Sequence, residues 1–325
     1  MVIRDWSSDV CSSDLASMAM IEGDFTGPSN IENHAFRLRH AYITLKWKNS
    51  LLLMGQYWTP LDLPEALPRP LALNTGAPFH SFTRSPQIRF EQQAGKWKAV
   101  LAALSQRDYP SPGPSGMSVD YQRRALIPNL HLQIHYTHHK TLAGLGADLK
   151  YLSPRLTTDS NWVTHEKISS LSLMAFLKTE SKNFQWKSQA ILGQNLPDHL
   201  MAGGYAVETI DTVTGVYDYI NLRHLFLWAD LTYRTGTLRW GLFAGFFENM
   251  GTSRPAYPIF YGRGADIARA FRLSPRIDWE LSPLLLSFEI EYTWAGYGHP
   301  DERYKPMDIK GVENLRLQAA ATYNF

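Results

Sequence analysis

The sequence predicts an all-β fold, namely a transmembrane, antiparallel, up-and-down β-barrel with about 14 strands visible in this chain. Three observations lead to this prediction. Apolar and polar side chains alternate along many segments, no run reaches the roughly 18 apolar residues that a spanning helix requires, and short polar turns alternate with long loops. A membrane protein without spanning helices must pair its backbone groups between the strands of a closed sheet.

Composition agrees with this fold class. The chain has 325 residues, of which 13% are aromatic, with 10 Trp and 16 Tyr, and its formal net charge is +2. Mean hydropathy is −0.26, which is low for a protein built from spanning helices. The length would also fit two soluble domains, but no segment resembles an interdomain linker. Cys11 is the only cysteine, so the fold does not depend on an internal disulfide.

The first fifteen residues differ from the rest of the chain. The stretch MVIRDWSSDVCSSDL contains no apolar core of the kind that a signal peptide needs. It resembles translated sequencing-adaptor sequence, so we expect residues 1–15 to be a non-native or disordered tail and residues 16–325 to form the barrel. On this interpretation the export signal and a hairpin precede the present sequence. The alternative is a short native polar tail.

Short and long connections divide the rest of the chain into period-two segments. The short, turn-compatible tetrapeptides are 47–50, 93–96, 137–140, 179–182, 234–237 and 280–283. The long connections, rich in Pro, Gly and Asp, are near 26–34, 59–82, 107–126, 153–163, 195–217, 250–265 and 297–310. Tight periplasmic turns and extended external loops are typical of outer-membrane barrels. The resulting even number of strands puts both chain ends on the periplasmic side.

Alternation assigns the two faces of several strands. In 284–294 the even positions are apolar, whereas the odd positions carry Ser287, Glu289 and Glu291. Near 36–47 the apolar parity changes, which predicts a β-bulge around His40. Aromatic residues near strand ends are expected to form interfacial girdles. Arg223 and Arg269 fall on the nominal lipid face, so we expect each of them at the external rim or at a further bulge.

The polar faces predict a lumen in which cations outnumber anions about two to one. The cations in this count are Arg37, Arg39, Lys46, Arg89, Lys98, Lys150, Lys178, Lys187, Arg239, Arg272, Arg276 and Arg316, and the anions are Glu91, Asp148, Asp230, Asp278, Glu289 and Glu291. A low-dielectric wall focuses the field of such charges, so the interior should favour anions. The alternative is that these charges pair across neighbouring strands and merely solvate the wall.

Two proline-rich loops are candidates for a constriction. Loop 59–82 carries four prolines before Pro78, and proline stiffens a loop by fixing φ. Segment 107–124 is the second candidate. We expect at least one of them to fold into the lumen, whereas the alternative is an external lid or a contact within a trimer.

The chain terminus suggests how such a barrel is assembled. The last eleven residues alternate in polarity and end on Phe325, with a second aromatic residue at Tyr323. A closing strand with this ending resembles the assembly signal of bacterial outer-membrane β-barrels. The resemblance implies the outer membrane as the location, and outer-membrane lipid and the barrel-assembly machinery as partners.

A more specific resemblance rests on five stretches of the N-terminal third. Residues 22–25, 36–42, 55–58, 84–89 and 105–108 are similar to those of DcaP-like outer-membrane porins in a version typical of Bacteroidota. The similarity covers about residues 22–125. It implies a homotrimer of about sixteen-stranded barrels for small anionic solutes such as dicarboxylates. It also places Arg37, Arg39, Arg84, Arg89 and Arg107 at or near the constriction, and it implies that an N-terminal hairpin is missing here.

The functional hypothesis is therefore passive diffusion of small hydrophilic, preferentially anionic solutes, with no nucleic acid, metal or cofactor involved. A general or sugar-selective porin is the alternative, with Trp58, Phe226 and Trp228 as an aromatic slide for the solute. An outer-membrane enzyme is less favoured, because the sequence shows no nucleophile elbow, phosphate-binding loop or metal spacing. The adjacent His138 and His139 fit a solvated turn better than a ligand pair.

Overall fold

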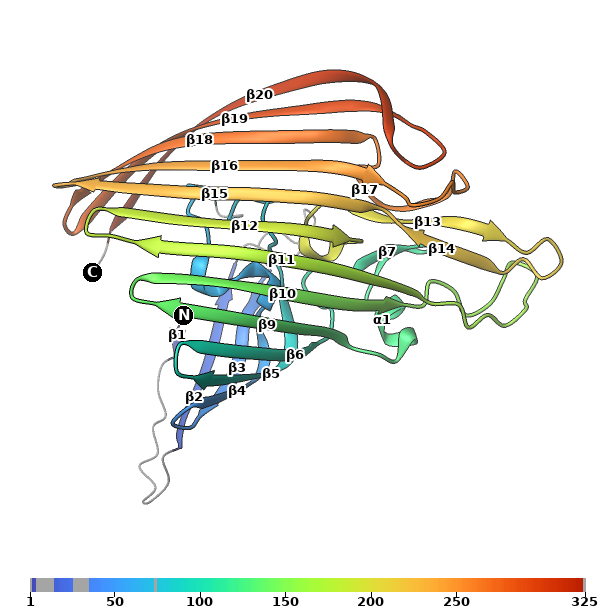
Figure 1. Ribbon diagram of the computed structural model, residues 1–325, viewed down its shortest axis with the longest axis horizontal. Helices are drawn as coiled ribbons and strands as arrows, with labels where there is room; N and C mark the ends of the chain where they lie inside the picture. Colours follow the sequence, from blue (N-terminus) through green and yellow to red (C-terminus); the bar gives the residue numbers. More distant parts are fainter. Residues whose placement is uncertain (1, 4–14, 26–34, 73–74, 324–325) are drawn as a thin grey trace.

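The structure is a computed structural model that describes residues 2–3, 15–25, 35–72 and 75–323. One antiparallel sheet of fifteen strands curves around an interior, and its strands follow one another in sequence order (Figure 1). The N-terminal strand of this sheet, β1 (Val2–Ile3), has only two residues and pairs with β2. Residues 4–14 of the expected tail lie outside the described part. The other fourteen strands are long, which confirms the predicted all-β fold and its strand number.

The long strands are β2 (Ala16–Asp24), β3 (Arg37–Lys46), β4 (Ser50–Trp58), β5 (Arg84–Ala94), β6 (Trp97–Leu104), β9 (Asn129–His138), β10 (Thr141–Leu152), β11 (Ile168–Glu180), β12 (Phe184–Gln194), β15 (Arg223–Thr235), β16 (Leu238–Gly251), β18 (Ile267–Leu281), β19 (Leu284–Pro300) and β20 (Pro306–Tyr323). Within the described residues, β2 and β20 are not paired with each other. No helix in the same part of the chain is long and apolar enough to cross a bilayer.

All six predicted short turns connect neighbouring strands, at one end of the sheet. The long connections carry smaller elements at the other end. These are β7 (Ser111–Gly113), β8 (Gly116–Ser118), α1 (Asp120–Ala125), β13 (Gly203–Ile210), β14 (Tyr217–Asn221) and β17 (Phe260–Arg263). The expected long loop 297–310 is wrong. Strands β19 and β20 extend their hairpin through the pair Pro300 and Pro306, so only 301–305 connect them.

The predicted faces are confirmed by burial. Along β10, Leu145 on the outward face is 67% exposed, whereas Asp148 and Lys150 on the inward face are buried. The same holds for β19, where Glu289 and Glu291 are buried and Phe288 is exposed. Apolar side chains therefore point away from the interior, as a wall in contact with lipid requires.

The structure also contains the predicted bulge. The register between β2 and β3 shifts after the pair Glu22 and His40, so that the next pair is Gly23 with Leu38. Similar shifts occur beside Arg223 in β15 and beside Arg269 in β18, and both residues lie at the loop end of their strands. The two arginines on the outward face therefore combine a bulge with a position near the rim.

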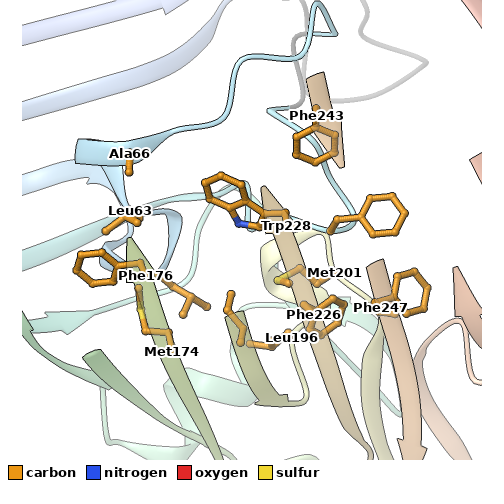
Figure 2. Packing of buried hydrophobic residues seen from close by; sticks show 14 of the residues in the cluster. Leu63, Ala66, Met174, Phe176, Leu196, Met201, Phe226, Trp228, Phe243 and Phe247 are labelled. Atoms are coloured by element: carbon orange, nitrogen blue, oxygen red, sulfur yellow. The ribbon is translucent and has the colours of Figure 1, made fainter. Parts of the chain in front are cut away.

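The interior contains an apolar cluster that the sequence pattern did not predict. Inward-facing side chains of β11, β12, β15 and β16 meet side chains of the loop between β4 and β5 (Figure 2). The buried members from the wall include Met174, Phe176, Ile191, Phe226, Trp228, Phe243 and Phe247. This cluster lies inside the barrel wall, so it holds the loop in place and does not contact lipid.

Candidate functional site

The loop that joins β4 and β5, residues 59–83, folds into the interior, and we call it the strap. It begins with two short 3-10 helices, η1 (Pro60–Asp62) and η2 (Pro64–Ala66), each with proline at its first position. Leu63, at φ 51°, is the left-handed residue between them. Leu61 and Leu63 are buried almost completely. The prediction that at least one proline-rich loop folds inward is therefore confirmed for this one.

Side chains of the wall satisfy the strap's backbone, as buried peptide groups require. The bonds to strap carbonyl oxygens are Gln133 Nε2 to Pro60 at 2.7 Å, Gln189 Nε2 to Leu61 at 2.9 Å, Lys187 Nζ to Leu67 at 2.8 Å and Arg272 Nη1 to Ala77 at 3.0 Å. The strap donates from Arg69 N to Asp230 at 3.0 Å and from Leu71 N to Glu289 at 2.8 Å. These partners come from five strands, so the strap crosses a large part of the lumen.

Apolar contacts fix the strap against β15 and β16. The ring of Phe79 lies so close to Gly245 that a Cβ there would be 2.5 Å from a ring atom. On the same strand, Phe243 is equally close to Gly76 of the strap. Phe226 and Trp228 are 1% and 3% exposed beneath these contacts. The expectation that they form a slide for solutes is wrong, because the strap covers them.

A buried polar network joins the strap to the loop before β13. Asp62 accepts hydrogen bonds from the Ser81 hydroxyl and from the Thr83 amide, the latter at 3.2 Å. Ser81 Oγ also lies 3.0 Å from His199 Nδ1 of η3 (Pro197–His199). His80 Nε2 lies 2.9 Å from the Asp62 carbonyl oxygen. Ser81, Asp62 and His80 are fully buried, so these hydrogen bonds hold the strap to the loop before β13 out of contact with solvent.

Burial sets the protonation of two of these strap groups. It raises the pKa of Asp62 to about 7, although the bonds from Ser81 and Thr83 act in the opposite direction. It lowers the pKa of His80 to about 3, and the bond to the Asp62 backbone only partly offsets this effect. Both side chains therefore favour their neutral forms while the strap is docked.

The predicted arginines of β3 lie opposite two acids of β2. Arg37 Nη2 is 2.7 Å from Asp24 Oδ2, and Arg39 contacts both Glu22 and Asp24 at 3.0 Å. His40 Nδ1 is 2.6 Å from Glu22 Oε2. The bulge at His40 brings these groups together.

Arg84, where the strap ends and β5 begins, is fully buried. Its Nε donates to Asp108 at 2.7 Å, and its guanidinium lies 4.9 Å from the ring centroid of Trp58. Its two terminal nitrogens have no hydrogen-bond partner in the described part of the chain. Trp58 therefore supports an arginine and does not stand free as a slide. Arg107, in the next loop, is exposed.

Arg89 belongs to a cluster of four charges between the wall and the strap. It is 2.7 Å from Glu91 and 3.5 Å from Glu65 of η2. Lys98 is 2.7 Å from Glu65 and 3.2 Å from Glu91. Burial alone would raise the pKa of Glu65, but the positive charges of Lys98 and Arg89 lower it to about 2. The strap thus carries a charged carboxylate into the ionic wall.

The last strands carry a second ionic ladder on the inward face. Arg276 is 3.7 Å from Glu289, and Glu291 is 3.5 Å from Arg272 and 2.7 Å from Arg316. Glu289 also receives the strap's Leu71 amide, so this ladder and the strap share a partner.

The remaining predicted residues also have partners. Lys150 is 2.6 Å from Asp198 of η3. Arg239 pairs with Glu280 near a short turn, and Lys187 binds the strap backbone as described above. Most of the predicted pore-lining cations therefore face inward and are paired.

The structure places more carboxylates inside the barrel than the sequence count included, so the predicted two-to-one ratio of cations to anions is too high. The sequence count took acids from strand faces only and left out Glu22 and Asp24 of β2. It also left out acids that the loops bring inside, namely Glu65, Asp108 and Asp198. Only the three-dimensional path of the loops places these carboxylates beside the arginines.

The lumen has one further feature that the sequence count missed. A pocket of about 440 Å³ lies between η2 and the inward face of β2 to β5. Arg89, Glu91 and Glu65 line one side of it, but Met18 and Leu51 also face it. The run Leu51-Leu52-Leu53-Met54 was the available indication, because it is apolar at both parities.

Only one of the two residues of the expected assembly signal belongs to the described part of the chain. Tyr323 ends β20 opposite Leu284, beside a short turn, and is 62% exposed. Phe325 lies outside the described residues.

Across the described ranges, no three His, Cys, Asp or Glu side chains are placed to hold a metal ion.

The fold is that of a porin-type β-barrel with the strap folded into its interior. No protein-family model matches the chain, and no curated protein matches it in sequence. Several solved structures, however, are similar to this chain. The outer-membrane channel DcaP of Acinetobacter baumannii is similar with a TM-score of 0.72 and 16% identity, over 97% of this chain and 82% of that one. The expected likeness to DcaP-like porins is thus confirmed at the level of the fold.

Two further structures agree with this class. OmpT, an outer-membrane protein of Vibrio cholerae described in a trimer form, is similar with a TM-score of 0.58 and 10% identity, over 96% of this chain and 87% of that one. OmpF of Salmonella typhi, in complex with daunomycin, gives a TM-score of 0.53 and 9% identity, over 96% and 87%. All three are barrels from outer membranes.

Proposed function

We propose that the protein is an outer-membrane porin for passive diffusion of small hydrophilic solutes, with a preference for anions such as dicarboxylates. The observation that supports this most is the strap, which narrows a lumen whose wall carries many guanidinium groups. A docked loop leaves a restricted aqueous path, and charges along that path select among solutes. No covalent chemistry is part of this proposal.

The preference for anions rests on inward-facing arginines that keep part of their surface accessible. The side chains of Arg37 and Arg39 are 23% and 29% exposed, although both also contact acids of β2. A guanidinium gives paired, charge-assisted hydrogen bonds to a carboxylate or a phosphate. In a wet pore each contact is weak enough for the solute to leave again.

Partners follow from the same proposal. The fold requires outer-membrane lipid around its apolar outward face. A homotrimer agrees with the trimer form described for the V. cholerae protein. Insertion by the barrel-assembly machinery would use the terminal strand β20, which ends at Tyr323. Such a channel would act by diffusion alone, without a cofactor.

Planar-bilayer recording under a salt gradient tests the proposal. We expect a reversal potential that indicates anion preference. Replacing Arg37 and Arg39 together by Gln should shift it toward zero or toward cations, because two positive charges leave the path. A matched Lys140→Gln change removes an exposed positive charge in the short turn between β9 and β10 and should leave the potential unchanged. A cation-selective wild-type channel would contradict the preference, and absence of conductance would contradict the porin.

A further inference from the structure

The pocket between η2 and the inward face of β2 to β5 combines apolar and charged walls. Its volume is about 440 Å³. Met18, Tyr42, Leu51, Leu53 and Tyr57 supply its apolar side. A cavity of this size holds a small organic solute, and a mostly apolar lining with a few charged groups is usual for ligand sites.

Strand register explains why these apolar groups face the interior. Leu53 pairs with Arg89 and Leu51 pairs with Glu91, so each leucine shares its face with an inward charge. Thr44 pairs with both Leu53 and Met18, which puts Met18 on the same face. The apolar side therefore runs along the strands beside the ionic cluster of β5 and β6.

The aromatic pair at one end of the pocket continues this apolar side. The rings of Tyr42 and Tyr57 lie 4.9 Å apart in an edge-to-face arrangement. A solute in this pocket therefore contacts both aromatic and aliphatic carbon. The alternative of an aromatic slide at Phe226 and Trp228 is thus not supported, whereas Tyr42 of β3 and Tyr57 of β4 offer comparable groups in this pocket.

The charged side of the pocket leaves one cation accessible. Glu65 and Glu91 each contact both Arg89 and Lys98 at 3.5 Å or less. Lys46 also lines the pocket, is exposed, and has no carboxylate within 4 Å among the described residues. The group that remains for a solute is therefore positive.

We propose that this pocket binds monoanionic solutes that carry an apolar alkyl or aryl body, with the anionic group toward Lys46. The inference rests on the proposed porin function and narrows its substrate class. Burying a methylene group is favourable by about 0.8 kcal/mol, so affinity should rise by up to about fourfold for each methylene that enters the pocket. A solute with a second carboxylate on its apolar body would lose this gain in affinity.

Current block in planar bilayers, recorded with the full chain, tests the proposal. The probes are acetate, butanoate and hexanoate, with adipate, norleucine and pentylamine as the dianion, zwitterion and cation of comparable length. We expect affinity to rise along the monoanion series. We also expect hexanoate to bind more tightly than any of the three comparators.

Two variants separate the apolar and the charged contributions. Leu51→Asn should flatten the dependence on chain length, whereas Lys46→Gln should weaken all monoanions by a similar factor and keep that dependence. Asn314→Ala, at an exposed position on the inward face of β20, is the control and should change neither. Because Lys46 is exposed, its variant remains informative if Leu51→Asn fails to fold.

The outcomes distinguish this inference from the proposed function. An anion-selective channel whose affinity for monoanions does not depend on chain length would overturn the pocket proposal and leave the porin intact. Tighter binding of adipate than of hexanoate would do the same. A wild-type channel without anion preference would instead contradict the proposed function.

Discussion

Replacing Asp62 by Asn tests the buried network that holds the strap. Asp62 is fully buried, and it accepts hydrogen bonds from the Ser81 hydroxyl and the Thr83 amide. Burial raises its pKa from 3.8 to about 7. An asparagine keeps an acceptor oxygen at this position but cannot ionise.

The sign of the pH effect follows from the raised pKa. Between pH 3.8 and about 7, Asp62 holds its proton while the strap is docked and releases it when the strap leaves. Undocking therefore becomes easier as the pH rises through this window, by about 1.4 kcal/mol per pH unit. Over the whole window the effect reaches about 4 kcal/mol. In Asp62→Asn this dependence is absent.

We therefore expect the undocking free energy of Asp62→Asn, relative to that of the wild type, to increase by about 3 kcal/mol between pH 4 and pH 7. His80 has the opposite dependence. Its pKa is lowered to about 3 while the strap is docked, so the docked strap loses stability as the pH falls below 6.5. It is present in both proteins, and its contribution cancels in the comparison.

Hydrogen exchange measured by mass spectrometry on strap peptides 59–72 and 75–83 reports undocking, after correction for the intrinsic pH dependence of exchange. Asp211→Asn, at an exposed acid in the loop between β13 and β14, controls for the loss of one negative charge. A difference between Asp62→Asn and the wild type that stays constant from pH 4 to pH 7 would refute the reasoning.

Three further changes test other parts of the molecule. Phe79→Ala removes a buried ring of the strap, should weaken docking by about 3–5 kcal/mol and should raise single-channel conductance; an unchanged conductance would show that the strap does not limit the path. Glu289→Gln keeps an acceptor for the Leu71 amide but removes a negative charge, so the reversal potential should move toward anions, and no movement would place Glu289 off the ion path. Gly55→Ala should reduce the yield of heat-modifiable folded barrel, because at φ 126° its Cβ would lie 2.3 Å from the Ala41 carbonyl oxygen; a normal yield would contradict this constraint.

The wall of the barrel was predictable because the pattern that specifies it lies in neighbouring residues. Each strand shows its lipid and lumen faces through a two-residue period, as in β10 and β19. Each short turn separates two such periods, and a change of parity near His40 was enough to predict a bulge. The extended β19–β20 hairpin was missed because Gly and Pro at 296–306 are also typical of loops.

The interior of the barrel was only partly predictable. Proline content indicated that the strap is stiff, but not which wall it contacts. Gln189 and Leu61, which share a hydrogen bond, are 128 residues apart, and Ser81 and His199 are separated by 118. No pattern along the chain records contacts of this separation.

The sequence by itself therefore determined the fold class, the strand order and most of the charged side chains that face inward, because alternation along a pleated strand depends on neighbouring residues alone. Only the tertiary structure decided which charges are paired, which aromatic residues the strap covers and where a solute meets apolar surface. Those properties depend on the path of the strap and of the loops that carry Asp108 and Asp198, and that path is set by packing between segments far apart in the chain.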